Sequence, residues 1–415
     1  MIDSVVSRRR TIEALRSGVP NRDAVSELGS SQHDIESRFE ALLNDVEGGR
    51  GNRGLLVGGD FGTGKSHLLE YLQHVALDRR FVTSKIVISK ETPLHDPVKV
   101  FRTAVSNAIV PGRRGSAIGE IARELDFDSE RFRELSRWMD SDDAGLNERF
   151  SATLYLYRDL HGSDEDFAER VVRFWSGDPI AVGEIKRRLR EAGEAASWPL
   201  SKVTVRDLAL QRFRFAAALI TAAGYSGWIL LFDEIELIGR YSLLQRGKSY
   251  AELARWVQGF EGERIPRLGA VLAVSDDLQT VVIDEKNDDE NVPARLRARG
   301  DDLLAARAER GISIVRRDTL HLERPDDRVL EETYRKLREL HSEAYRWEAP
   351  ELTVELGALM RSMRQYVRAW IHEWDLRRLD PGYRPAIEVG ELRVEYSEDP
   401  DLELPPEGDS EVEDA

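Results

Sequence analysis

The sequence predicts an α/β fold, in which a parallel sheet carries a helical insertion and is followed by a helical C-terminal lid. Short apolar runs rich in β-branched residues alternate with longer segments of helical periodicity, which is typical of strand–helix–strand units. A glycine-rich turn joins the first of these strands to the helix after it. The charged stretch of residues 112–206 contains no confident strand, so it is predicted to be helical.

The strands of this sheet are expected in six short apolar runs. These are residues 53–58, 81–88, 228–232, 268–274, 312–315 and 319–322. Asp96 and Pro97 predict the start of a helix, because aspartate caps helix N-termini and proline is tolerated in the first turn. The strongly acidic residues 284–291 are expected to form a mobile loop.

Four segments follow from this reading of the chain. They are an N-terminal helical segment (1–52), a sheet core (53–325, with the insertion at 112–206), a helical lid (326–390) and an acidic disordered tail (391–415). The tail is expected to be disordered because it combines prolines with acidic residues and has few apolar ones.

Composition limits where the protein works and what it contacts. No stretch approaches the roughly 20 apolar residues that cross a membrane, and the segment after Arg10 lacks the apolar region of a signal peptide. The absence of cysteine excludes disulfides and fits a reducing compartment. We therefore expect a cytoplasmic protein without membrane contact. A net charge of −16 argues against a surface built throughout for nucleic acid, but leaves a local DNA contact open.

A complete phosphate-binding motif, G-x-x-x-x-G-K-[ST], follows the first strand. Its residues are Gly59, Asp60, Phe61, Gly62, Thr63, Gly64, Lys65 and Ser66. Glycines let successive backbone N–H groups point into one cavity, and the following helix adds its positive end. Lys65 is predicted to bind the β- and γ-phosphates, and the Ser66 hydroxyl to ligate magnesium. The motif therefore predicts a P-loop that binds ATP with Mg²⁺.

Two carboxylates follow the strand of residues 228–232, at the edge where ligands bind in parallel sheets. Asp233 is predicted to hold magnesium, and Glu234 to act as the general base that polarises the attacking water. The alternative is a strand end with solubilising acidic residues. Ser275 follows the strand of residues 268–274 and either positions this water or is a plain turn serine. Together these residues predict hydrolysis of ATP to ADP and phosphate.

With these motifs in place, residues 53–325 resemble the core of an AAA+-type ATPase, and residues 326–385 resemble its small helical lid. The resemblance implies that Arg364 is a second-sensor arginine, which reaches from the lid to the γ-phosphate. This chain has Met363 where the family usually has proline. The alternative is an exposed arginine that pairs with a neighbour on its helix.

AAA+ proteins commonly form rings in which an arginine of one subunit completes the site of its neighbour. The resemblance therefore implies a homo-oligomer. The candidate arginines are Arg295, Arg297, Arg299, Arg307 and Arg310. The first three alternate along the chain and cannot share one helix face. For each of the five, the alternative is a solvated basic surface.

A narrower resemblance rests on two segments, IEALRSGVP at residues 12–20 and GGDFGTGKSH at residues 58–67. Both are similar to the ATP-binding proteins of BREX-type phage-defence systems, and the second adds His67 to the expected ATP-binding residues. This resemblance implies a helicase or another defence protein as partner, and action on or near DNA. The rival hypotheses are a non-hydrolysing switch that docks a partner when ATP is bound, and a motor that moves along DNA.

Overall fold

A single six-stranded sheet forms the centre of the protein in the computed structural model, which describes residues 2–17, 25, 28–50, 54–113, 116–260, 263–352, 362–380, 382–383 and 396–399. The strand order is β3-β2-β4-β5-β1-β6. The strands are β1 (Leu55–Gly59), β2 (Val82–Val87), β3 (Ala108–Ile109), β4 (Trp228–Asp233), β5 (Leu268–Ser275) and β6 (Leu320–His321). Only β3 pairs antiparallel, with β2. The predicted α/β fold with a mostly parallel sheet is confirmed.

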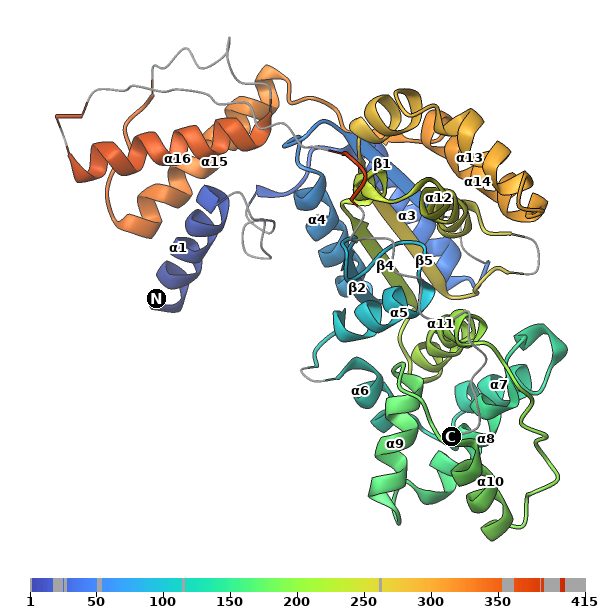
Figure 1. The fold of residues 1–415 in the computed structure, drawn as a ribbon. Coiled ribbons are helices and arrows are strands. Elements are labelled where there is room, and N and C mark those ends of the chain that lie inside the picture. Colours follow the sequence, from blue (N-terminus) through green and yellow to red (C-terminus); the bar gives the residue numbers. More distant parts are fainter. Residues whose placement is uncertain are drawn as a thin grey trace.

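Helices cover both faces of the sheet (Figure 1). Helices α3 (His33–Glu47) and α4 (Lys65–Asp78) pack on one face, and α5 (Pro97–Ser106), α11 (Val205–Ala222) and α12 (Leu243–Gln258) pack on the other. Within β4, Ile229 and Leu231 belong to the first core and Leu230 and Phe232 to the second. Because both faces are buried, the central strands are continuous apolar runs. Asp96 caps α5 as predicted, and accepts hydrogen bonds from two backbone N–H groups.

Two predictions for the second half of the core are wrong. Residues 312–315, predicted as a strand, lie in α14 (Asp302–Arg317), and the acidic segment 284–291 is mostly helical. It ends a π-helical turn, η3 (Leu278–Asp284), and begins α13 (Asp288–Arg297). A short, mostly apolar run does not by itself distinguish a strand from a segment of a buried helix. Helix α14 packs so closely on α12 that a Cβ added at Gly311 would lie 2.0 Å from the carbonyl oxygen of Tyr250.

Five helices occupy the stretch for which the sequence predicts a helical insertion, and they form the lower lobe in Figure 1. They are α6 (Ala117–Arg123), α7 (Glu130–Met139), α8 (Glu148–Leu160), α9 (Glu165–Trp175) and α10 (Val182–Glu191), with a short 3-10 turn, η1 (Asp142–Ala144). The two-residue strand β3 before this lobe was not predicted from the sequence. Among the described helices of the whole chain, none is long and apolar enough to cross a membrane.

The lid combines the N-terminal helix with two helices that follow the sheet domain in sequence. Helices α15 (Asp327–Tyr345) and α16 (Met363–Leu379) pack with the N-terminal helix α1 (Ile2–Ser17), away from the sheet (Figure 1). Ile12 of α1 is fully buried in the hydrophobic core of the lid, and Arg16 pairs with Asp375 of α16 at 2.6 Å. The predicted tail (391–415) lies outside the described residues, apart from residues 396–399, which contact the sheet domain.

Candidate functional site

The loop between β1 and α4 closes around its glycines. Gly62 and Gly64 have φ angles of +82° and +110°, in the left-handed region that L side chains rarely adopt. A Cβ on Gly59 would lie 2.7 Å from Oγ1 of Thr63. This turn therefore requires glycine at the positions where the phosphate-binding motif has it.

Lys65 is the first residue of α4, and its ammonium lies inside the curve of the loop. The Nζ atom donates to the carbonyl oxygens of Gly59 at 2.8 Å and Asp60 at 3.1 Å. No side chain of the described residues caps α4, so its first N–H groups face the loop without a side-chain acceptor. The loop thus presents an ammonium, a helix N-terminus and backbone donors together, which suits a phosphate chain.

Asp233 and Glu234 stand at the carboxyl end of β4, as predicted. Asp233 is buried, and its Oδ2 lies 3.9 Å from Nζ of Lys85. Glu234 has a φ angle of +62°, which costs about 1–2 kcal/mol for a residue with a side chain and is typical of functional sites. Burial raises the pKa of the Glu234 carboxyl and the charge of Asp233 adds to this, whereas Lys65 and Arg364 oppose it. Glu234 therefore lies within electrostatic reach of both the P-loop lysine and the lid arginine.

Ser275 ends β5, the strand that lies between β1 and β4. In the sheet register it stands opposite Gly59 of the P-loop. Its backbone N–H donates to Oε2 of Glu236 at 2.9 Å, and its Oγ accepts from the backbone N–H of Asp277 at 3.4 Å. Ser275 is buried beside the loop, a more specific position than that of a solvent-exposed turn serine.

The first turn of α16 lies on the P-loop. A capping box of Ser362 and Gln365 begins this helix. The backbone N–H of Arg364 donates to the carbonyl oxygen of Gly62 at 3.4 Å, and its guanidinium lies 5.2 Å from the centre of the Phe61 ring. The structure thus brings the predicted second-sensor arginine to the loop.

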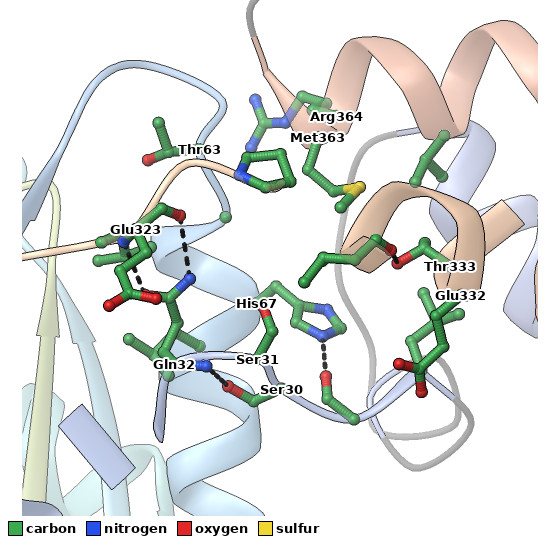
Figure 2. Close-up of a pocket in the computed structure, with 18 of the residues that line it drawn as sticks. Ser30, Ser31, Gln32, Thr63, His67, Glu323, Glu332, Thr333, Met363 and Arg364 are labelled. Atoms are coloured by element: carbon green, nitrogen blue, oxygen red, sulfur yellow. Dashed lines mark hydrogen bonds between the residues drawn. The ribbon is translucent and has the colours of Figure 1, made fainter. Parts of the chain in front are cut away.

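A cavity of about 270 Å³ opens beside the P-loop, between the sheet domain and the lid (Figure 2). Segment 28–33, the loop after β6 and helices α15 and α16 line it. The Gln32 side chain closes one wall, because its amide accepts from the backbone N–H of Glu323 at 2.8 Å and donates to the Glu323 carbonyl at 3.1 Å. His67 also lines the cavity, and its Nε2 lies 2.9 Å from the Gly29 carbonyl oxygen. Burial lowers the pKa of His67, so the ring is neutral near pH 7 and Nε2–H donates to that carbonyl.

Sequence reasoning missed three parts of this site. Segment 28–33 carries no motif, and only the folded chain brings it to the P-loop. Glu236 is buried, and burial raises the pKa of its carboxyl. Asp276 lies near Lys65 and His321, and burial raises its pKa too. The spacing of Glu236 from Glu234 was a legible signal, since both acids follow the same strand.

The five candidate arginines differ in their surroundings. Arg297 donates to both carboxylate oxygens of Glu309 at 2.8 Å. Arg307 pairs with Glu263, and Arg310 donates to Gln258 at 2.6 Å. Arg295 and Arg299 are exposed, and neither side chain has a hydrogen bond or ion pair with any described residue. These two therefore remain available to another molecule.

The oxygen donors near the loop suit magnesium. Among the described residues, no group of three or more histidine or acidic side chains forms a metal site by itself. Mg²⁺ in phosphate-binding sites is typically held by one or two protein oxygens together with phosphates and water. The hydroxyl of Ser66 and the carboxylate of Asp233 offer that kind of donor set.

Comparison with known protein families identifies a family that includes most of the chain. A family model described as BREX system ATP-binding protein BrxC/D matches residues 4–373. The match runs from α1 into α16, so it includes the P-loop, both carboxylates and Arg364. A search of curated proteins finds no match.

Proposed function

The chain belongs to the BREX system ATP-binding protein BrxC/D family, and from this premise we propose that it is an ATPase of the AAA+ class. Membership makes the chain an ATP-binding component of a phage-defence system. The observation that carries the proposal is the convergence of Lys65, Glu234 and Arg364. The charges of Lys65 and Arg364 both lower the pKa of Glu234, although the three residues come from the start of α4, the lid helix α16 and the end of β4.

ATP is proposed to bind with its phosphates in the loop of residues 59–66 and its adenosine in the 270 Å³ cavity. Lys65 would exchange its bonds to the loop carbonyls for bonds to the β- and γ-phosphates. Ser66 and Asp233 would hold Mg²⁺, which neutralises phosphate charge when it is bound. His67 contributes by fixing Gly29 in the wall of the cavity.

Three residues are proposed to serve hydrolysis. Glu234 accepts the proton of the attacking water as general base. Ser275 positions that water, which is supported by its place on the strand between the P-loop and the carboxylates. Arg364 stabilises charge on the γ-phosphate from the lid.

The AAA+ assignment also implies an assembly. We propose a homo-oligomer that works on or near DNA with other proteins of the defence system, among them a helicase or a similar enzyme. Family membership supports a role beside other defence-system proteins. The exposed side chains of Arg295 and Arg299 support contact between subunits, since neither has a hydrogen-bond or ion-pair partner among the described residues of its own chain.

Two substitutions test ATP binding and hydrolysis separately. Lys65→Ala is expected to abolish ATP binding in calorimetry. Glu234→Gln keeps the size and hydrogen-bonding capacity of the side chain, so it is expected to preserve binding and to lower phosphate release by at least roughly 10²-fold.

Phosphate release is measured with and without DNA, since a partner ligand can be required for turnover. Release at the parent rate by Glu234→Gln would show that the general-base assignment is wrong. If the unaltered protein binds ATP but releases phosphate no faster than Lys65→Ala in every condition, the chain is a nucleotide-operated switch.

A further inference from the structure

Residues 396–399, here called the strap, follow the lid in sequence but lie against the sheet domain (Figure 1, the short red segment beside α12). Tyr396 is 6% exposed and belongs to the main hydrophobic core. The strap therefore docks specifically, through a buried aromatic side chain.

The strap makes hydrogen bonds to the turn that directly follows Glu234 in sequence. This turn is η2 (Ile235–Arg240). The backbone N–H of Asp399 donates to the carbonyl oxygen of Arg240 at 3.0 Å. The ammonium of Lys286 donates to the Gly239 carbonyl at 2.9 Å and to the Tyr396 carbonyl at 2.8 Å, so it joins the turn to the strap.

The Arg246 side chain also links the end of η2 to the strap by hydrogen bonds. Its Nη1 donates to the carbonyl oxygen of Tyr241 at 2.7 Å and to Oε1 of Glu398 at 2.6 Å. The same guanidinium is fixed by Asp288, with two hydrogen bonds of 2.8 Å to the carboxylate. Three consecutive carbonyls at the end of η2 are thus held by the strap or by side chains that bind the strap.

The strap also contacts the loop after β5. The Tyr396 hydroxyl donates to Oδ2 of Asp277 at 3.2 Å, and the Asp277 backbone N–H donates to Oγ of Ser275. Burial raises the pKa of Tyr396, and the nearby carboxylates of Glu236 and Glu234 raise it further. The phenol therefore stays protonated and remains a donor near neutral pH.

From these contacts we propose that the strap is a clip that joins the turns after β4 and β5 and so sets the positions of Glu234 and Ser275. Tyr396 and Glu398 are positioning residues in this role. Glu234 has a backbone conformation that is unfavourable by itself and persists only where surrounding contacts impose it. The inference rests on the proposed hydrolysis for its kinetic consequence.

Tyr396→Ala and Glu398→Gln test the clip in the full chain. Displacing a catalytic group slows chemistry without weakening remote binding contacts, so kcat for ATP hydrolysis is expected to fall roughly tenfold or more. The Kd for ATP should stay within about twofold of the parent value, because the strap does not line the cavity.

Two controls separate positioning from general stability. Tyr396→Phe keeps the buried ring and loses only the bond to Asp277, which joins the strap to the turn after β5. Its kcat should therefore stay lowered while its thermal stability stays near the parent value. Glu351→Gln is the matched control for Glu398→Gln, because Glu351 is an exposed carboxylate held by Arg338 at 3.0 Å in the lid. It should leave kcat unchanged.

Amide hydrogen exchange without nucleotide gives a readout that does not require hydrolysis. The clip predicts faster exchange in segments 235–241 and 276–278 of Tyr396→Ala, and unchanged exchange there in Glu351→Gln. Parent values of both kcat and exchange in Tyr396→Ala would overturn the inference. If the parent itself hydrolyses no ATP, the proposed function is wrong, and unchanged exchange would then overturn the clip separately.

Discussion

Glu234 combines a left-handed backbone with a carboxyl whose pKa is raised by burial and by Asp233. Both features favour a general base, since a raised pKa gives a stronger proton acceptor at the pH where the group is still ionised. The nearby cations of Lys65, Arg364 and Lys85 oppose the rise. If Glu234 is the base that we propose, the balance among these groups sets the pH range of hydrolysis.

We expect kcat/KM to fall as pH decreases through the pKa of Glu234, because protonation removes the base. Since this pKa lies above the ordinary value of a glutamate, activity is lost at a higher pH than for an exposed glutamate. Lys85→Met removes one cation that lowers the pKa of Glu234, so the pH at which kcat/KM falls on the acid side should move further upward. Profiles between about pH 5 and pH 8 check this. Lys202→Met, on the exposed surface of the insertion, serves as the control. If Lys85→Met loses kcat/KM at the same pH as the parent, the assignment of Glu234 as the base is contradicted.

At this scale the sequence located candidate residues where they are contiguous. The phosphate-binding motif and the Asp233–Glu234 pair are such groups, and the structure places them at the loop after β1 and at the end of β4. The bond between Glu236 and the Ser275 backbone joins η2, the turn after β4, to the end of β5. No local pattern contains such a contact, and it was therefore missed.

At the scale of elements, buried parallel strands were recognisable because they are continuous apolar runs. Residues 312–315 have the same appearance but form one turn of α14, a helix that packs against α12. The acidic segment 284–291 was misjudged for a related reason. Asp288 is completely buried and neutralised by Arg246, a partner 42 positions away, so acidity there does not indicate a loop.

Helix α13 and the residues after it supply a prediction about assembly. If Arg295 or Arg299 completes the site of a neighbouring subunit, replacing both with alanine should lower kcat by roughly 10³-fold without changing ATP affinity. Arg307→Ala is the contrasting variant, because Arg307 is engaged by Glu263 and lies 4.3 Å from the centre of the Phe260 ring. It should lower the thermal stability and leave kcat of the folded protein near the parent value.

Mixing experiments distinguish a contribution to a neighbour's site from one to the same chain. Lys65→Ala subunits are inactive but keep both arginines. Adding them to the double-arginine variant should restore part of the activity if the arginine acts between subunits. Activity that stays at the level of the double variant at every mixing ratio would contradict this role.

For the whole molecule, the main unexpected feature is that α1 belongs to the lid. The sequence predicted a helical segment at residues 1–52, but not that its first helix would pack with α15 and α16, more than 300 positions away. This packing gives the IEALR segment a physical role. Ile12 and Leu15 enter the lid core, and Arg16 binds Asp375.

Ile12→Ala should therefore destabilise the lid selectively. Ile12 is completely buried, and such a truncation costs about 2–5 kcal/mol. Hydrogen exchange should increase in α15 and α16 and stay near parent values in the sheet. Val6→Ala on the same helix is the matched control, because Val6 is 43% exposed. Equal acceleration in the sheet and in the lid would contradict a separate lid core.

Because α1 packs in the lid, dyes on α1 and on the sheet domain could report movement of the lid relative to the sheet. Residues 6 and 38 are close in sequence, yet residue 6 lies on α1, which packs in the lid, and residue 38 lies on α3 of the sheet domain. Since the natural chain has no cysteine, Val6→Cys and Arg38→Cys would introduce the only two thiols for dye attachment. Energy transfer between such dyes would report how the angle between lid and sheet changes when nucleotide binds.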